Sequence, residues 1–124
     1  MNDSGHFFPL WGTCMGFEYL NAFAADAGMD ILTELESHNI ELTLDWLEDP
    51  VTTQMFEDAG ADAQAFQTVP FAYQSHTYGV ALSAYTTDAG LGAMFTPTST
   101  SSDPNYGSTF VSTMEAKNYP IFGT

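Results

Sequence analysis

The chain has 124 residues, of which 44% are hydrophobic and 15% aromatic, enough apolar material for one small domain with a packed core. Sixteen acidic residues against a single basic one, Lys117, give a formal net charge of −15 at pH 7, which excludes binding to nucleic acid or to an anionic membrane surface through a basic patch. No apolar run reaches the roughly 20 residues needed to span a bilayer, and residues 1 to 6 lack the features of a signal peptide. The single cysteine excludes an internal disulfide.

The first organised stretch of the chain predicts a strand, a tight turn and a helix. An apolar run over Phe7–Trp11 is typical of a buried strand, and apolar residues at steps of three and four predict a helix over Met15–Ala27. Between them stands a Gly-x-Cys-x-Gly pattern, which is that of a nucleophile elbow. In such an elbow the reactive side chain sits on a strained turn, so Gly12 and Gly16 supply the nearly side-chain-free flanks that we expect around Cys14.

Two side chains of this stretch are candidates for chemistry. A thiol at the N-terminus of a helix is favoured as thiolate, which makes Cys14 a candidate nucleophile, although a lone cysteine is also commonly a small buried hydrophobe. Glu18 follows four residues later on the same helix face. It either buttresses the elbow or positions a substrate amine, or it is only a favourable negative charge near a helix N-terminus.

The rest of the chain predicts further short elements in the following order: strands at 31–35 and 40–44, helical turns at 53–56 and 62–67, strands at 71–74 and 79–82, a short helix at 87–95, a Ser/Thr/Pro surface loop at 96–104, and strands at 109–114 and 119–123 joined by a tight turn. His76 falls between two of these strands, where a histidine is available for chemistry. Neither it nor His6 or His38 has a partner at metal-ligand spacing, so no metal site is expected.

Three stretches together resemble the γ-glutamyl hydrolase family, within the class I glutamine amidotransferase-like superfamily. They are 3–18, 74–78 and 110–123. The family shows a Phe-Pro-(apolar)-Trp-Gly-Thr-Cys-(apolar)-Gly-Phe-Glu run at its nucleophile, and a Ser-Thr-Met-Glu run that leads into Tyr-Pro-(apolar)-(aromatic)-Gly. This chain carries both runs in the same order, so the resemblance spans nearly its whole length and is weakest from about residue 28 to 70.

The resemblance implies an α/β fold: part of a three-layer sandwich with a largely parallel sheet, a nucleophile elbow and a C-terminal hairpin. It also implies hydrolysis of γ-linked glutamate from folylpoly-γ-glutamates through an acyl-enzyme, without a metal or organic cofactor. By position, Cys14 matches the nucleophile, Glu18 the glutamate beside it and His76 a histidine near the substrate cleft, so Glu18 and His76 are the expected substrate-binding residues. In the reaction so implied, the backbone N–H of Met15 donates to the oxyanion. A homodimer of the full-length protein, and a lysosomal, vacuolar or secreted location, are further implications.

Two departures from the family pattern limit this expectation. His76-Thr77-Tyr78 replaces the family's His-Lys-Trp. The family's Gln-Trp-His-Pro-Glu segment, which holds the catalytic acid/base histidine, and the strands before the nucleophile strand have no counterpart in residues 1 to 124. We therefore expect residues 1–124 to form a single truncated hydrolase domain that is inactive, or nearly so, by itself.

Two other functions remain open at this point. A glutaminase of the amidotransferase type shares the Gly-x-Cys-x-Gly elbow, although the Trp-Gly-Thr and Ser-Thr-Met-Glu runs favour the hydrolase branch. The second is a non-catalytic remnant that keeps the wall of the pocket without the chemistry.

Overall fold

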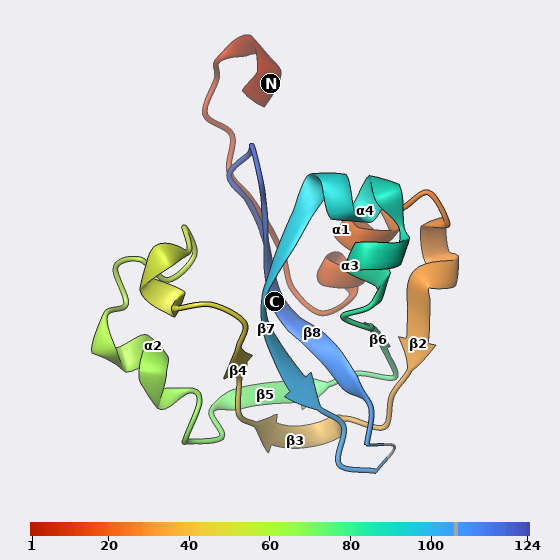
Figure 1. The fold of residues 1–124 in the computed structure, drawn as a ribbon, viewed down its shortest axis with the longest axis vertical. Coiled ribbons are helices and arrows are strands. Elements are labelled where there is room, and N and C mark those ends of the chain that lie inside the picture. The colour runs from red at the N-terminus through yellow and green to blue at the C-terminus, as the bar shows by residue number, and fades with distance from the viewer. Residues whose placement is uncertain (106) are drawn as a thin grey trace.

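A computed structural model describes residues 1–105 and 107–124. Its centre is a five-stranded sheet with the order β1-β9-β8-β7-β4 (Figure 1). The strands are β1 (Leu10–Gly12), β9 (Ile121–Gly123), β8 (Thr109–Ala116), β7 (Phe95–Ser102) and β4 (Asp45–Trp46). Two smaller antiparallel pairs accompany it: β2 (Leu32–Glu34) with β6 (Tyr78–Val80), and β3 (His38–Leu42) with β5 (Ala72–Ser75).

Helices flank the central sheet. Figure 1 shows α1 (Met15–Ala24), α3 (Ala84–Thr87) and α4 (Ala89–Met94) gathered on one side, with α2 (Ala61–Ala65) on the other. Three short 3-10 turns cover Asn2–Ser4, Gly28–Ile31 and Pro50–Thr52. The core lies between the sheet and the group of three helices, where Phe17, Leu91 and Met114 are almost completely buried. None of the helices in the described residues is long and apolar enough to cross a membrane.

The prediction of a mixed α/β fold is confirmed, but the expected largely parallel sheet is wrong for the described residues. Only β1 and β9 pair in parallel, whereas β9–β8, β8–β7 and β7–β4 are antiparallel. The connections explain the difference, because the short links from β7 to β8 and from β8 to β9 leave no room for the crossover that parallel neighbours need. The hairpin predicted near the end of the chain is confirmed by the β8–β9 pair.

The surface loop predicted for 96–104 is also wrong. Strand β7 covers most of this stretch and lies between β8 and β4. Thr98, Ser99 and Ser101 are fully buried in β7. The hydroxyls of Thr98 and Ser99 hydrogen-bond with the Thr113 hydroxyl of β8, and the Ser101 hydroxyl donates to the Thr43 carbonyl. Pro97 is tolerated because it sits at a register shift in the β7–β8 ladder.

Smaller corrections concern where elements begin and end. Strand β1 begins at Leu10, because only 10–12 pair with β9. Helix α1 ends at Ala24 and not at Ala27, since the next residue is extended and the N–H groups of Asp26 and Ala27 donate to the Asp88 carboxylate. The helical turn predicted at 53–56 is wrong, because a 3-10 turn at Pro50–Thr52 takes its place. The predicted turn at 62–67 corresponds to α2, and the strands around His76 to β5 and β6.

Candidate functional site

Cys14 is the N-cap of α1 and stands two residues after the end of β1, which is where an elbow places its reactive residue. Its backbone has φ 57° and ψ −117°, a positive φ that side-chain-bearing residues rarely adopt. Such a conformation costs roughly 1–3 kcal/mol and persists only where the surrounding structure fixes it. The thiol is exposed, so the alternative of a buried hydrophobic cysteine is wrong.

The two glycines of the motif are not equivalent. A Cβ on Gly12 would lie 2.6 Å from the Gly16 carbonyl oxygen and 2.6 Å from a methyl of Leu20, so the turn needs glycine at this position. A Cβ on Gly16 would meet nothing within 4 Å among the described residues. The expectation that both positions beside the elbow must be nearly free of a side chain is therefore right for Gly12 and wrong for Gly16.

The elbow is tied to the end of the last strand. Cys14 donates its backbone N–H to the Thr124 carbonyl at 2.9 Å, and Thr124 donates its own N–H to the Gly12 carbonyl at 2.9 Å. The side chain of Thr124 also lies 3.3 Å from the Thr13 hydroxyl and accepts from the Trp11 indole N–H at 3.3 Å. These hydrogen bonds from Thr124, which follows β9, fix the strained backbone of the elbow in place.

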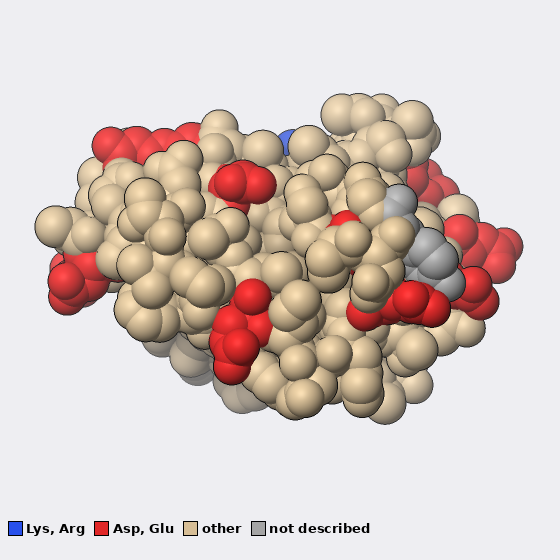
Figure 2. All heavy atoms as spheres, turned by 90° about the horizontal axis from the view of Figure 1, so that it is seen from below, with Lys and Arg blue, Asp and Glu red and all other residues tan. Residues whose placement is uncertain are grey.

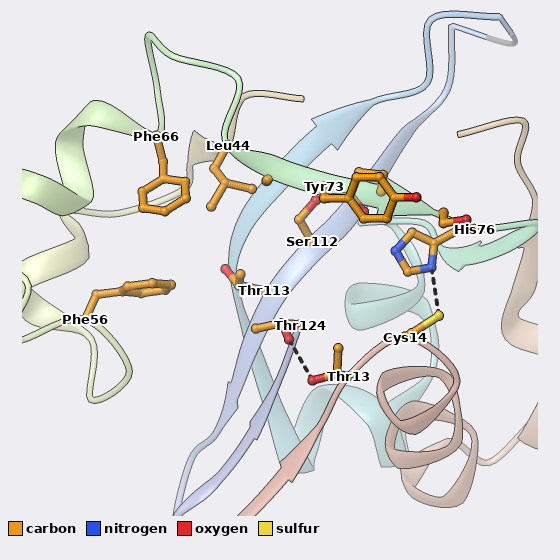
Figure 3. A pocket seen from close by; sticks show the side chains of 13 residues that line it. Thr13, Cys14, Leu44, Phe56, Phe66, Tyr73, His76, Ser112, Thr113 and Thr124 are labelled. Atoms are coloured by element: carbon orange, nitrogen blue, oxygen red, sulfur yellow. Dashed lines mark hydrogen bonds between the residues drawn. The ribbon is translucent and has the colours of Figure 1, made fainter. Parts of the chain in front are cut away.

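His76 approaches the thiol from the other side of the site. Its Nδ1 lies 3.8 Å from the Cys14 Sγ, a contact visible in Figure 3. The backbone N–H of His76 donates to the Ser37 carbonyl at 2.7 Å, and its ring packs at 6.3 Å against Phe110. Partial burial lowers the pKa of His76, so the imidazole is neutral at pH 7 and one ring nitrogen can accept a proton.

Met15 and Glu18 occupy the first turn of α1. The N–H of Met15 is among the first N–H groups of the helix, which have no intrahelical partner, whereas the N–H of Cys14 is already bonded to Thr124. Glu18 is half-buried and lines a small cavity that His76 and Tyr78 also line. Burial raises the pKa of its carboxyl group. Glu18 thus lines the same small cavity as His76, one helical turn along α1 from Cys14.

A cavity of about 360 Å³ adjoins Cys14 and His76. One end carries hydroxyls, from Thr13, Ser112 and Thr113, and the other is formed by apolar side chains (Figure 3). Leu44, Phe56, Phe66 and Tyr73 are the large apolar or aromatic members of the lining. This size and mixture are typical of small-molecule sites.

Several of these lining residues had no signal in the sequence. Phe56 and Phe66 come from the segment around α2, where the resemblance is weakest, and Thr113 belongs to a motif that predicted a strand but not a cavity wall. The signal that could have indicated a site is the polar pair Ser112-Thr113 within an otherwise largely apolar strand. Among the described residues no group of three His, Cys, Asp or Glu side chains could hold a metal ion.

No family model matches. A gamma-glutamyl hydrolase of Bos taurus is 33% identical over 120 residues, which is 96% of this chain and 36% of that protein. Gamma-glutamyl hydrolase B of Dictyostelium discoideum is 26% identical over 123 residues (98% of this chain, 35% of that protein), and a gamma-glutamyl hydrolase of Homo sapiens 28% over 122 residues (98% and 37%). The chain is thus similar over nearly its whole length to gamma-glutamyl hydrolases, as its motifs predicted, and it spans about a third of the length of these curated relatives.

Proposed function

We propose that this chain carries the nucleophile region of a hydrolase that cleaves γ-glutamyl amide bonds, with Cys14 as the nucleophile. The observation that carries the proposal is the strained, exposed Cys14 at the start of α1, with its Sγ 3.8 Å from a neutral His76 at the edge of a 360 Å³ cavity. The names of the similar proteins supply the bond type. The fold we propose for the parent domain is the three-layer glutamine amidotransferase-like sandwich.

The proposed reaction has two halves. The Cys14 sulfur attacks the γ-amide carbonyl carbon while its proton passes to a base, and the N–H of Met15 donates to the oxyanion that forms. Collapse breaks the C–N bond, the leaving amine takes a proton, and a γ-glutamyl thioester remains on Cys14. Water then attacks the thioester, its proton returns to the base, and a free γ-carboxylate leaves with the thiol restored.

Two histidines are candidates for that base: His76, and a histidine that the family resemblance places in a segment without a counterpart in residues 1 to 124. His76 Nδ1 is close enough to accept the thiol proton, and the low pKa of its ring keeps it neutral and ready to do so. The resemblance instead assigns proton transfer to the histidine of a Gln-Trp-His-Pro-Glu segment and places His76 and Glu18 beside the substrate. We propose that His76 holds the thiol and the substrate, and that the 124-residue chain alone turns over little or no substrate.

The remaining assignments rest on the same resemblance. The substrate would be a folylpoly-γ-glutamate, the full-length protein would be a homodimer, and its location would be a lysosome, a vacuole or the outside of the cell. An excess of acidic residues fits an acidic compartment, in which part of the carboxylates are protonated.

Covalent labelling tests the nucleophile without requiring turnover. A γ-glutamyl chloromethyl ketone should alkylate Cys14, with the sulfur displacing chloride, and intact-mass measurement counts the adducts. Cys14→Ser should remain unlabelled. The ketone should react faster than chloroacetamide, which lacks the glutamyl group, and free γ-glutamyl-glutamate should slow both reactions because it covers Cys14 when it binds.

Turnover then separates the alternatives. Glutamate release from folyl-γ-diglutamate is followed for the 124-residue chain, for the longest protein that its gene encodes, and for Cys14→Ala and His76→Ala variants of each. Activity of the 124-residue chain that His76→Ala abolishes would make His76 the base. Faster hydrolysis of glutamine than of γ-glutamyl-glutamate would favour the glutaminase. Equal labelling by the ketone and chloroacetamide would mean a remnant that does not recognise γ-glutamyl groups.

A further inference from the structure

A buried glutamine stands between the two cavities of the site without a hydrogen bond for its side chain. Gln74 lies on β5, is only 6% exposed, and pairs through its backbone with Ile40 of β3. Its side chain lines both the cavity of about 360 Å³ beside Cys14 and the small cavity that Glu18 lines. Among the described residues no group hydrogen-bonds to its carboxamide, although an unpaired buried amide costs free energy. A polar group kept at such a cost is typical of a functional site.

The small cavity beside Gln74 has room for one water-sized group. Its volume is about 10 Å³, which is roughly what a single water molecule needs. A carboxylate is too large for this space, so the partner of the carboxamide is a water molecule or a ligand substituent with a single heavy atom. A γ-glutamyl unit has one such substituent, its α-amino group.

The polar atoms around this small cavity suit a hydrogen-bond donor. Glu18 contributes a carboxylate, and Gln74 offers its amide oxygen. The Ser112 hydroxyl also lines the cavity, but it donates its hydrogen to the Ser101 hydroxyl at 2.8 Å, so its oxygen is left to accept. These acceptors from three side chains match the three N–H donors of an ammonium group.

The charge of the chain favours a cation at this position. The chain contains no arginine, and its single lysine, Lys117, donates to the Gly92 carbonyl and does not line the small cavity. Figure 2 shows acidic side chains spread over the face that it presents, with only a trace of basic surface. Burial raises the pKa of the Glu18 carboxyl group, and an ammonium group beside it would offset the cost of its buried charge. A free amino group is therefore attracted to this cavity, and a further carboxylate is repelled.

We propose that Gln74, together with Glu18 and Ser112, holds the free α-amino group of a γ-glutamyl substrate. The γ-carbonyl of that unit then lies against Cys14, so this site rests on the proposed function. The substrate class is γ-glutamyl peptides and amides whose α-amino group is free. A γ-glutamyl unit with an acylated α-nitrogen, as in a folylpoly-γ-glutamate, has no positive charge there and is too bulky for the small cavity. Such a unit should therefore bind more weakly, with its α-nitrogen outside the small cavity.

Calorimetry on the 124-residue chain tests this amino site without requiring turnover. γ-Glutamyl-glutamate is compared with glutaryl-glutamate, which is the same compound without the α-amino group, and with N-acetyl-γ-glutamyl-glutamate. γ-Glutamyl-glutamate should bind roughly tenfold more tightly than either, since hydrogen bonds to a charged group contribute on that scale. Gln74→Met keeps the length of the side chain without its polar atoms and should remove most of this preference. Gln74→Glu keeps an acceptor and should retain the preference, whereas a glutamine that donated to the α-carboxylate would make Gln74→Glu weaken γ-glutamyl-glutamate and glutaryl-glutamate alike.

The matched control is Gln67→Met. Gln67 undergoes the same chemical change, but it is exposed and lines neither cavity, so all three affinities should stay unchanged. Urea unfolding without ligand gives a second readout. Because Gln74→Met removes an unpaired buried amide, this variant should unfold at the same urea concentration as wild type or at a higher one. Loss of a glutamine with a structural role would lower that concentration.

The outcomes separate the amino site from the proposed function. Equal affinity for γ-glutamyl-glutamate and glutaryl-glutamate, or no binding of either, would overturn the amino site. A preference that survives Gln74→Met would mean that the small cavity holds only a water molecule, and a lower urea midpoint of that variant would mean a structural role; both contradict the proposal. An amino preference that depends on Gln74, together with absent labelling of Cys14 by the γ-glutamyl ketone, would keep the amino site and overturn the proposed function. Labelling of Cys14 with equal affinity for the probes would keep the nucleophile and remove the amino site.

Discussion

Replacing Thr113 by valine should destabilise the chain well beyond an ordinary surface change. Thr113 is 4% exposed, and its hydroxyl lies 2.7 Å from the Thr98 hydroxyl and 2.6 Å from the Ser99 hydroxyl, both on β7 and both fully buried. Valine keeps the shape but removes the oxygen, so both β7 hydroxyls lose this partner. Leaving one buried hydroxyl unsatisfied costs roughly 1–3 kcal/mol, and two therefore cost roughly 2–6 kcal/mol.

This loss is large compared with the stability of a domain, which is about 5–15 kcal/mol. For a chain of this size each kcal/mol corresponds to about 4 °C, so the midpoint of thermal unfolding should fall by roughly 8–24 °C. Urea unfolding followed by tryptophan fluorescence and circular dichroism gives the free energy directly.

A compensating variant makes the reasoning refutable. Combining Thr113→Val with Thr98→Val and Ser99→Ala removes all three hydroxyls together, and replacing both partners of a hydrogen bond by apolar groups can be nearly neutral. The triple variant should thus be more stable than Thr113→Val alone, in spite of its two additional substitutions. If the single variant loses less than about 0.5 kcal/mol, or if the triple variant is the least stable, the hydroxyl cluster does not hold β7 and β8 together.

Three further predictions address the elbow, the helices and the hydrogen bond from Met55 to β8. Gly12→Ala should slow labelling of Cys14 and lower stability because the new Cβ would meet the Gly16 carbonyl at 2.6 Å, whereas Gly16→Ala, where space is open, should do neither. Backbone hydrogen bonds hold the pKa of the Asp88 carboxyl in the folded chain below its ordinary value of 3.8. The ionised carboxylate therefore stabilises the fold fully above pH 3.8, and this stabilisation is lost as the pH falls through the pKa of the folded state. The urea midpoints of wild type and Asp88→Asn should accordingly differ at pH 7 and converge in acid. Glu115→Ala removes the acceptor of the Met55 N–H, so it should lower the free energy of unfolding measured in urea by about 1 kcal/mol.

The elbow could be predicted from the sequence because its signals are local. A strand, a glycine and a helix with apolar residues at steps of three and four are all recognised within about twenty residues, and the structure has Cys14 at the N-cap of that helix. The difference between Gly12 and Gly16 could not be read in the same way. It depends on how closely the first turn of α1 packs against the end of β1, and the spacing of residues in the sequence does not specify that distance.

Strand β7 was missed because its composition is typical of loops. Serine and threonine hydroxyls compete with the backbone for hydrogen bonds and are therefore common in turns. In β7 they are satisfied across the sheet, by Thr113 and by Ser112, which donates to the Ser101 hydroxyl at 2.8 Å. The second half of that network lies on β8, so the polar run becomes interpretable as a strand only when its partner is known.

The contact between His76 and Cys14 has a similar origin. The two residues are separated by 62 positions, and nothing in the spacing brings them together. His76 reaches the thiol because its backbone N–H is bonded to the Ser37 carbonyl at the start of the β3–β5 pair, while the elbow is bonded to the end of β9. The resemblance placed both residues near the substrate, but the 3.8 Å distance follows from tertiary packing.

The same packing explains why the two most specific motifs of the chain stand at its opposite ends. The Phe-Pro-Leu-Trp-Gly-Thr-Cys run forms β1 and the elbow, and the Tyr-Pro-Ile-Phe-Gly run forms β9, its parallel neighbour. Cys14 and Gly12 are both bonded to Thr124, so the strained φ of 57° is imposed by a strand more than a hundred residues away. A nucleophile elbow in this protein is therefore a property of two strands, and a substitution that displaces β9 should disturb Cys14 as strongly as one within the motif itself.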